Sequence, residues 1–139
     1  MFRWKDNRSE CYDDLFDVTP PAGTRNGMGF RRQDVFGFVI KDRENAGEDM
    51  AFLYNCQQVE CAKRVGTGEE IVSGDRLFAY PVTAGIALTT PQYFEVSPVA
   101  TGTAGVDYIF CGIAKFDAGA NDTTVIFKFI GITPTATDL

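Results

Sequence analysis

Residues 123–130 read TTVIFKFI, and they carry the clearest strand pattern in the chain. Val125, Phe127 and Phe129 stand at alternate positions, with Lys128 between the two phenylalanines. Successive side chains of a strand point to opposite faces of a sheet, so the three apolar residues share one face. The spacing predicts a strand that buries this face in a core.

The same pattern extends upstream from position 28, where β-branched and aromatic stretches alternate with Gly, Asn, Asp and Pro. A hairpin tip is expected at Ala84-Gly85, and a long loop follows the segment that returns from it. No segment has helical periodicity beyond two turns. The sequence therefore predicts an all-β fold: a small single-domain β-barrel or β-sandwich with an extended N-terminal arm. The expected strands are 35–40, 49–62, 76–80, 86–89, 107–116 and 123–130, with turns at 43–48, 66–68, 73–75 and 118–122 and a brief pairing at 93–96.

Three regions are expected: an arm over 1–25, a β domain over 26–131 and a loose tail over 132–139. The arm places Trp4, Tyr12 and Phe16 among acidic residues and runs into Pro20-Pro21, which no helix continues through. Two interpretations stay open. The arm reaches a neighbouring subunit with these aromatics as anchors, or it folds back on its own domain.

Composition limits the possible functions. The chain has 139 residues, which suits one core, and 45% of them are hydrophobic. Its net charge of −6 disfavours nucleic-acid binding, which uses a clustered basic face. No apolar run approaches the roughly 18 residues of a membrane span, and the charged N-terminus does not resemble a signal peptide. We therefore expect no membrane partner, folding in a cytoplasm, and reduced thiols.

Histidine is absent from the sequence, which removes the usual triads and histidine-ligated metals. Cys56 and Cys61 lie five positions apart, so a regular strand would point their thiols to opposite faces unless a bulge intervened. The acidic pairs look like solvated turns and lack the ligand pattern of a calcium loop. We expect a protein that is not an enzyme, with no catalytic residue, no metal and no cofactor, and with buried structural cysteines.

An ordered set of short motifs spans residues 35–130. It comprises Gly37-Phe38-Val39, Ala46-Gly47-Glu48, Val59-Glu60-Cys61-Ala62-Lys63, Gly74-Asp75-Arg76-Leu77-Phe78, Gly112-Ile113-Ala114 and the stretch from Ala118 to Val125. In this order the motifs resemble the phage capsid cement, or head decoration, proteins. The acidic N-terminal segment and the long aromatic loop at 90–105 depart from that family's pattern.

The resemblance implies a structural protein on the outer surface of a phage head, synthesised in the host cytoplasm. Its partners would be the major capsid protein and further copies of itself, as a homotrimer or a dimer. Contacts between capsomers would be stabilised by it. The residues expected at such interfaces are Trp4, Tyr12, Phe16, Tyr93 and Phe94.

Two other functions are weighed against this one. The first is a carbohydrate- or receptor-binding β module of a phage particle, with Trp4, Tyr93 and Phe94 as an exposed aromatic platform. The second is a hydrolase built on two loop carboxylates about 5–10 Å apart.

Overall fold

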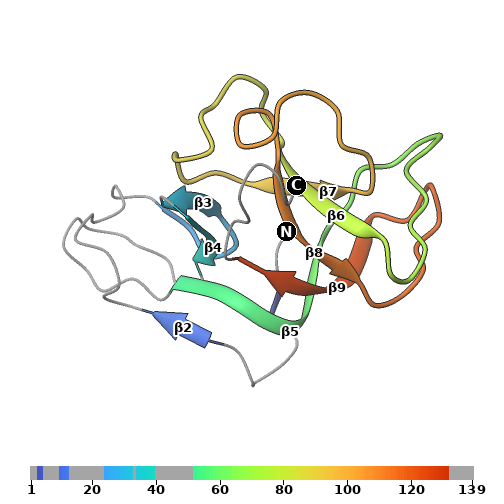
Figure 1. The fold of residues 1–139 in the computed structure, drawn as a ribbon, viewed down its shortest axis with the longest axis horizontal. Coiled ribbons are helices and arrows are strands. Elements are labelled where there is room, and N and C mark those ends of the chain that lie inside the picture. Colours follow the sequence, from blue (N-terminus) through green and yellow to red (C-terminus); the bar gives the residue numbers. More distant parts are fainter. Residues whose placement is uncertain (1–2, 5–9, 13–23, 33, 40–51, 132–139) are drawn as a thin grey trace.

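The computed structural model describes residues 3–4, 10–12, 24–32, 34–39 and 52–131 (Figure 1). Within these ranges every regular element is a strand, which confirms the all-β prediction. Among the described residues no helix has the length and apolar character of a membrane span. The strands are β1 (Arg3–Trp4), β2 (Glu10–Tyr12), β3 (Gly29–Arg32), β4 (Val35–Val39), β5 (Phe52–Ala62), β6 (Arg76–Pro81), β7 (Phe94–Ser97), β8 (Ile109–Ala114) and β9 (Thr124–Ile130).

Seven of the strands form a nearly closed antiparallel barrel in the order β3-β4-β5-β9-β8-β6-β7. The two ends of this sheet meet through isolated bridges. Val96 in β7 pairs with Lys63 just beyond β5, and Gln92 just before β7 pairs with Gly29 in β3. The sequence left a barrel and a sandwich open, and the structure shows the barrel.

Strand β5 is the longest, with 11 residues, and it pairs with β4, β9, β1 and β2. Its pairing with β9 contains a bulge, because Gln57 and Gln58 together lie opposite Lys128. A bulge inserts one residue and reverses the inward–outward alternation beyond it. Cys56 and Cys61 are therefore both buried in the core, although five positions separate them.

The largest side chains of the core are phenylalanines on β4, β7 and β9. Val125, Phe127 and Phe129 are buried while Lys128 is exposed, so the alternation expected for β9 is confirmed. Phe36 lies edge-to-face with Phe94 at 5.0 Å between ring centroids and with Phe129 at 6.0 Å. Edge-to-face pairs add about 0.5–1.5 kcal/mol to the gain from burial alone. Aromatic rings from strands far apart in sequence thus pack directly across the barrel.

Segment 86–89, expected as a strand, consists of turns and irregular backbone. The amide of Thr90 and the side-chain amide of Gln92 both bond to the Ala87 carbonyl, which bends the segment back on itself. The strand that pairs with β6 is instead β7. It begins one residue later than the brief pairing expected at 93–96.

Part of the chain expected to form the arm pairs with its own domain: β1 and β2 lie antiparallel to β5. Trp4 and Tyr12 belong to these strands, and Phe16 lies outside the described residues. The turn expected at 43–48 and the tail at 132–139 also lie outside them.

Gly112 lets β8 and β9 approach closely. A Cβ atom at this position would collide with the carbonyl group of Lys128 and lie 2.9 Å from the ring of Phe127. The residue stands beside a bulge, because Leu77 pairs with Gly112 while Phe78 pairs with Phe110. This contact therefore leaves no room for a side chain, and the φ of 155° at the same position also favours glycine.

We predict that Gly112→Ala lowers the free energy of unfolding by about 3 kcal/mol, because backbone atoms of β9 must move. The control is Gly74→Ala, where φ is 96° and nothing lies within 4 Å of the added Cβ. That change introduces left-handed strain alone, at about 1 kcal/mol. Urea unfolding of both variants measures the difference, and equal losses would contradict the close approach.

Candidate functional site

A cleft of about 460 Å³ opens between the connections that follow β6 and β7. We call it the Arg64 cleft. It is lined by Arg64, Tyr80, Pro81, Ala84, Gly85, Ile86, Ala87, Thr101, Val106 and Asp107. The volume falls in the range of sites that hold small molecules.

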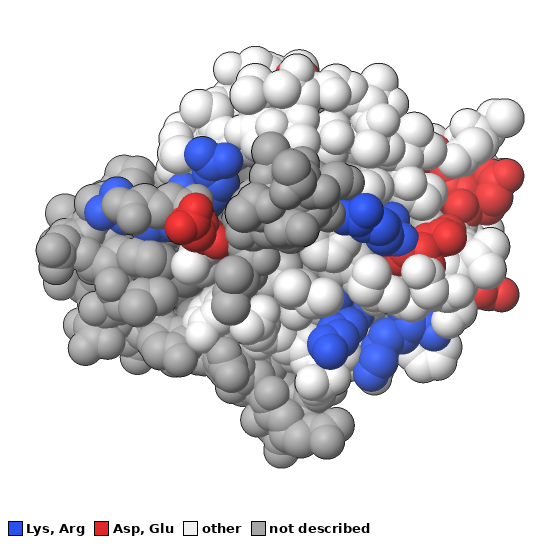
Figure 2. All heavy atoms as spheres, viewed as in Figure 1, with Lys and Arg blue, Asp and Glu red and all other residues white. Residues whose placement is uncertain are grey.

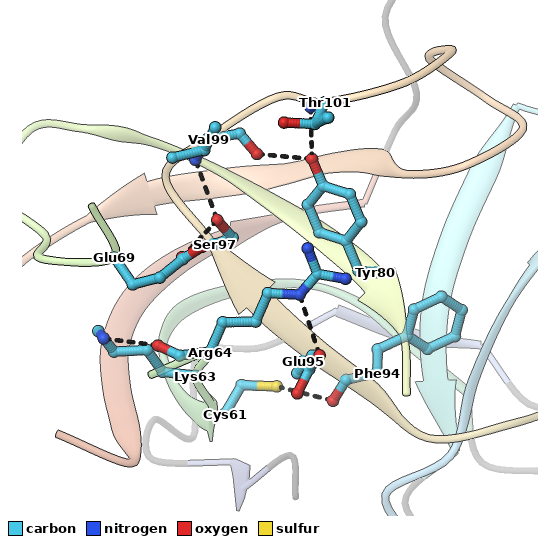
Figure 3. Close-up of polar contacts among 10 residues, drawn as sticks. All are labelled: Cys61, Lys63, Arg64, Glu69, Tyr80, Phe94, Glu95, Ser97, Val99 and Thr101. Atoms are coloured by element: carbon cyan, nitrogen blue, oxygen red, sulfur yellow. Dashed lines mark hydrogen bonds and ion pairs between the residues drawn. The ribbon is translucent and has the colours of Figure 1, made fainter. Parts of the chain in front are cut away.

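Arg64 reaches the cleft from the segment just beyond β5 (Figure 3). Its backbone amide donates to the Val96 carbonyl, and its side-chain Nε donates to Glu95 Oε1 at 2.9 Å. The two side chains are about one third exposed, so this ion pair contributes under about 1 kcal/mol. Its main effect is to fix the plane of the guanidinium.

The guanidinium carbon of Arg64 lies 3.8 Å from the centre of the Tyr80 ring, in cation–π geometry. Within the part of the chain that the structure describes, Arg64 donates side-chain hydrogen bonds only through Nε. Its two terminal nitrogens therefore remain available to a ligand.

Tyr80, which lies under Arg64, also holds a loop of the cleft in place. Its hydroxyl donates to the Val99 carbonyl and accepts from the Thr101 amide at 2.7 Å (Figure 3). The ring also packs against Tyr108 at 5.5 Å between centroids. One side chain of β6 thus fixes the loop that carries Thr101.

Asp107 is the one carboxylate among the lining residues. Its Oδ2 accepts from the Thr103 amide at 2.7 Å, which positions the group at the base of its loop. The described lining therefore offers one carboxylate where a carboxylate-based hydrolase needs two. Among the described residues no group of three or more Cys, Asp or Glu side chains is arranged to hold a metal ion.

The sequence-predicted interface residues lie in different places. Tyr93 is 43% exposed beside the hairpin connection, as a surface anchor requires. Phe94 is only 2% exposed and packs against Phe36 and Phe38, so its assignment to an exposed platform is corrected. The reason is the alternation of β7, which sends neighbouring side chains to opposite faces. The backbones of Trp4 and Tyr12 lie in β1 and β2, and Phe16 lies outside the described residues.

The residues of the Arg64 cleft were not predicted from the sequence. Lys63 and Arg64 stand out in the sequence only as adjacent basic residues, and Tyr80 only as the end of a strand. The available signal was a Tyr-Pro pair at the end of a strand, where side chains commonly border a loop. Nothing local indicates that residues 64, 80 and 107 meet.

Exposed apolar side chains lie near both ends of β6. At the start of the strand, Val72 and Phe116 are 59% and 54% exposed. They lie on adjoining loops, because Ile71 and Ala118 exchange backbone hydrogen bonds. Beyond the other end, Val82 is 56% exposed and its amide donates to the Tyr93 carbonyl. We call the pairs Val72–Phe116 and Val82–Tyr93 the two apolar ends.

The two apolar ends are separated by the length of β6, which has six residues. A strand rises about 3.3 Å per residue, so the ends lie about 20 Å apart. The loops at 63–75 and 115–122 are seen at one side of Figure 1, and the connection after β6 is seen at the other.

The cysteines at 56, 61 and 111 are free thiols in the core. Burial raises the pKa of Cys61 from 9.0 to about 12, and burial together with Cys61 raises the pKa of Cys111. The Cys111 thiol donates to the Leu77 carbonyl at 3.4 Å. Cys61 and Cys111 are therefore protonated, and all three thiols are buried, as expected of packing groups.

Comparison with known protein families, curated proteins and solved structures found no match to this chain.

We predict that Cys61 makes stability fall at alkaline pH. Its folded pKa is raised to about 12, so the unfolded chain loses the proton above about pH 9 while the folded chain keeps it. The stabilisation is complete below about pH 9 and is lost as the pH rises toward 12. Cys61→Ala should make this decline shallower by up to about 1.4 kcal/mol per pH unit. Urea unfolding across this pH range tests the prediction; parallel declines for both proteins would contradict it.

Proposed function

We propose that this chain is a phage capsid decoration protein, which binds the outer surface of a head and holds neighbouring capsomers together. The observation that carries the proposal is the presence of exposed apolar side chains beyond both ends of β6. A protein that bridges two neighbours needs two separate contact surfaces and a stiff connection between them.

The motifs behind the resemblance also support the proposal. Gly37-Phe38-Val39 belongs to β4, the turn at Gly74-Asp75 leads into β6, and Gly112-Ile113-Ala114 belongs to β8. These residues form the turns and buried strands of one barrel. The likeness to cement proteins therefore concerns the elements that build the fold, and the contact loops between them are free to vary.

Adhesion of this kind requires area and copy number. Each apolar end offers a small contact whose own affinity would be low. On a symmetric shell a chain bound at one end meets the second capsomer at high effective concentration, so the two contacts reinforce each other. Binding only to the assembled shell then stabilises that state by linkage. Homotrimers or dimers of the chain would multiply the effect.

The charge distribution agrees with a position away from the genome. The net charge is −6, and basic side chains stand at separate places on the face shown in Figure 2. Most acidic side chains visible on that face gather at one end, and one acidic group lies beside basic side chains at the other. An outward-facing protein on the particle needs no basic surface for nucleic acid.

The test uses heads of the phage that encodes the chain, prepared without the protein and then mixed with it. We predict that Val72→Asp combined with Phe116→Asp weakens binding to heads by tenfold or more, because a charge must then be desolvated at the contact. Val82→Asp at the other end should have a similar effect. Co-sedimentation measures the bound fraction.

The matched control is Val99→Asp, because Val99 is also an exposed valine, at 42%, and belongs to neither apolar end. Binding by this variant should equal that of the unchanged protein. Thermal unfolding of each variant separates lost adhesion from lost folding. Full binding by folded variants at both ends would overturn the proposal, as would heads that bind none of the unchanged protein.

A further inference from the structure

The lining of the Arg64 cleft contains both apolar and polar side chains. Pro81, Ala84, Ile86 and Val106 supply hydrocarbon surface, and Arg64, Thr101 and Asp107 supply polar groups. Such a division suits a ligand that has one apolar face and a polar edge. The residues of the two apolar ends are not among the lining residues, although Val82 stands between Pro81 and Ala84 in the same connection.

The charges of the cleft select the ligand class. Arg64 is already paired with Glu95, so its positive charge is largely compensated. Asp107 adds a carboxylate to the lining and would repel an anion. Together with Glu95, these groups leave one negative charge at the cleft, which disfavours an anion. The remaining donors on Arg64 would face a cation unfavourably, so a neutral ligand that both accepts and donates hydrogen bonds fits the groups present.

The polar groups are also fixed before any ligand arrives. Glu95 and the Tyr80 ring hold the guanidinium, the Tyr80 hydroxyl holds the loop at Thr101, and the Thr103 amide holds Asp107. A site whose groups are already oriented loses little conformational entropy on binding. These contacts distinguish the cleft from a simple gap between loops, because its polar groups are held in place.

We infer that the Arg64 cleft binds a neutral carbohydrate. A sugar ring has a C–H face that matches the apolar lining residues. Its neighbouring hydroxyl groups accept hydrogen bonds from the terminal nitrogens of Arg64 and donate one to the Asp107 carboxylate. The site is distinct from the exposed aromatic platform that the sequence predicted, since Tyr80 is 5% exposed and its ring is covered by Arg64.

The test is a glycan array that displays neutral and acidic glycans, followed by NMR titration of the labelled full chain with the sugars that score. We expect neutral sugars to bind and to shift the amide signals of Ala84, Thr101 and Asp107. Acidic sugars of similar size should bind at least tenfold more weakly, because Asp107 and Glu95 oppose their charge.

Asp107→Asn is the decisive variant. The asparagine can still accept from the Thr103 amide, but it presents a donor to the cleft in place of an acceptor. We expect at least a tenfold loss of sugar affinity with unchanged thermal unfolding. The matched control is Asp117→Asn, because Asp117 accepts from the Ser73 amide in the same way but lies outside the cleft. This control should keep full affinity.

Three results would overturn the inference: no neutral sugar binding up to about 10 mM, a preference for acidic sugars, or equal affinity of Asp107→Asn and the unchanged protein. The outcome is independent of capsid binding, because Asp107→Asn leaves both apolar ends intact. A failed sugar titration would leave the decoration proposal standing, and failed head binding would leave the sugar site standing.

Discussion

The closure of the barrel depends on how β5 ends. The amide of Lys63 donates to the Thr123 carbonyl next to β9, and the amide of Arg64 donates to the Val96 carbonyl in β7. Two consecutive residues thus tie β5 to strands on its two sides. Lys63 is only 4% exposed, and its ammonium donates to the carbonyls of Arg64 and Ala120, which offsets the cost of burying the charge. The same closure brings Arg64 over Tyr80 and so builds the wall of the cleft.

Much of the fold was predictable because strand and turn signals are local. The alternation of Val125, Phe127 and Phe129 fixed the inner face of β9, and the turn at Gly74 marked the start of β6. The position of Phe94 was not predicted, because an aromatic residue in a Thr- and Pro-rich loop has no local sign of burial. Segment 86–89 was mistaken for a strand because the Gln92 side chain that bonds to Ala87 comes later in the sequence.

The candidate site was largely beyond prediction. Arg64 follows β5, Tyr80 belongs to β6 and Asp107 lies in the connection after β7, and only the barrel brings them together. The cysteines illustrate the same limit on a smaller scale. Their odd spacing indicated opposite faces, and the bulge at Gln57 and Gln58 reversed that result. Local periodicity defines strands well, whereas bulges and closures decide which side chains meet.

We propose that the barrel works by contact, with the exposed apolar pairs at the two ends of β6 bridging neighbours. Electron cryo-microscopy of phage heads saturated with the protein tests this most directly. We predict density on the outer surface, between adjacent capsomers, with Val72 and Phe116 against one capsomer and Val82 and Tyr93 against the next. Density confined to a single capsomer, or a head exterior without this chain, would contradict it.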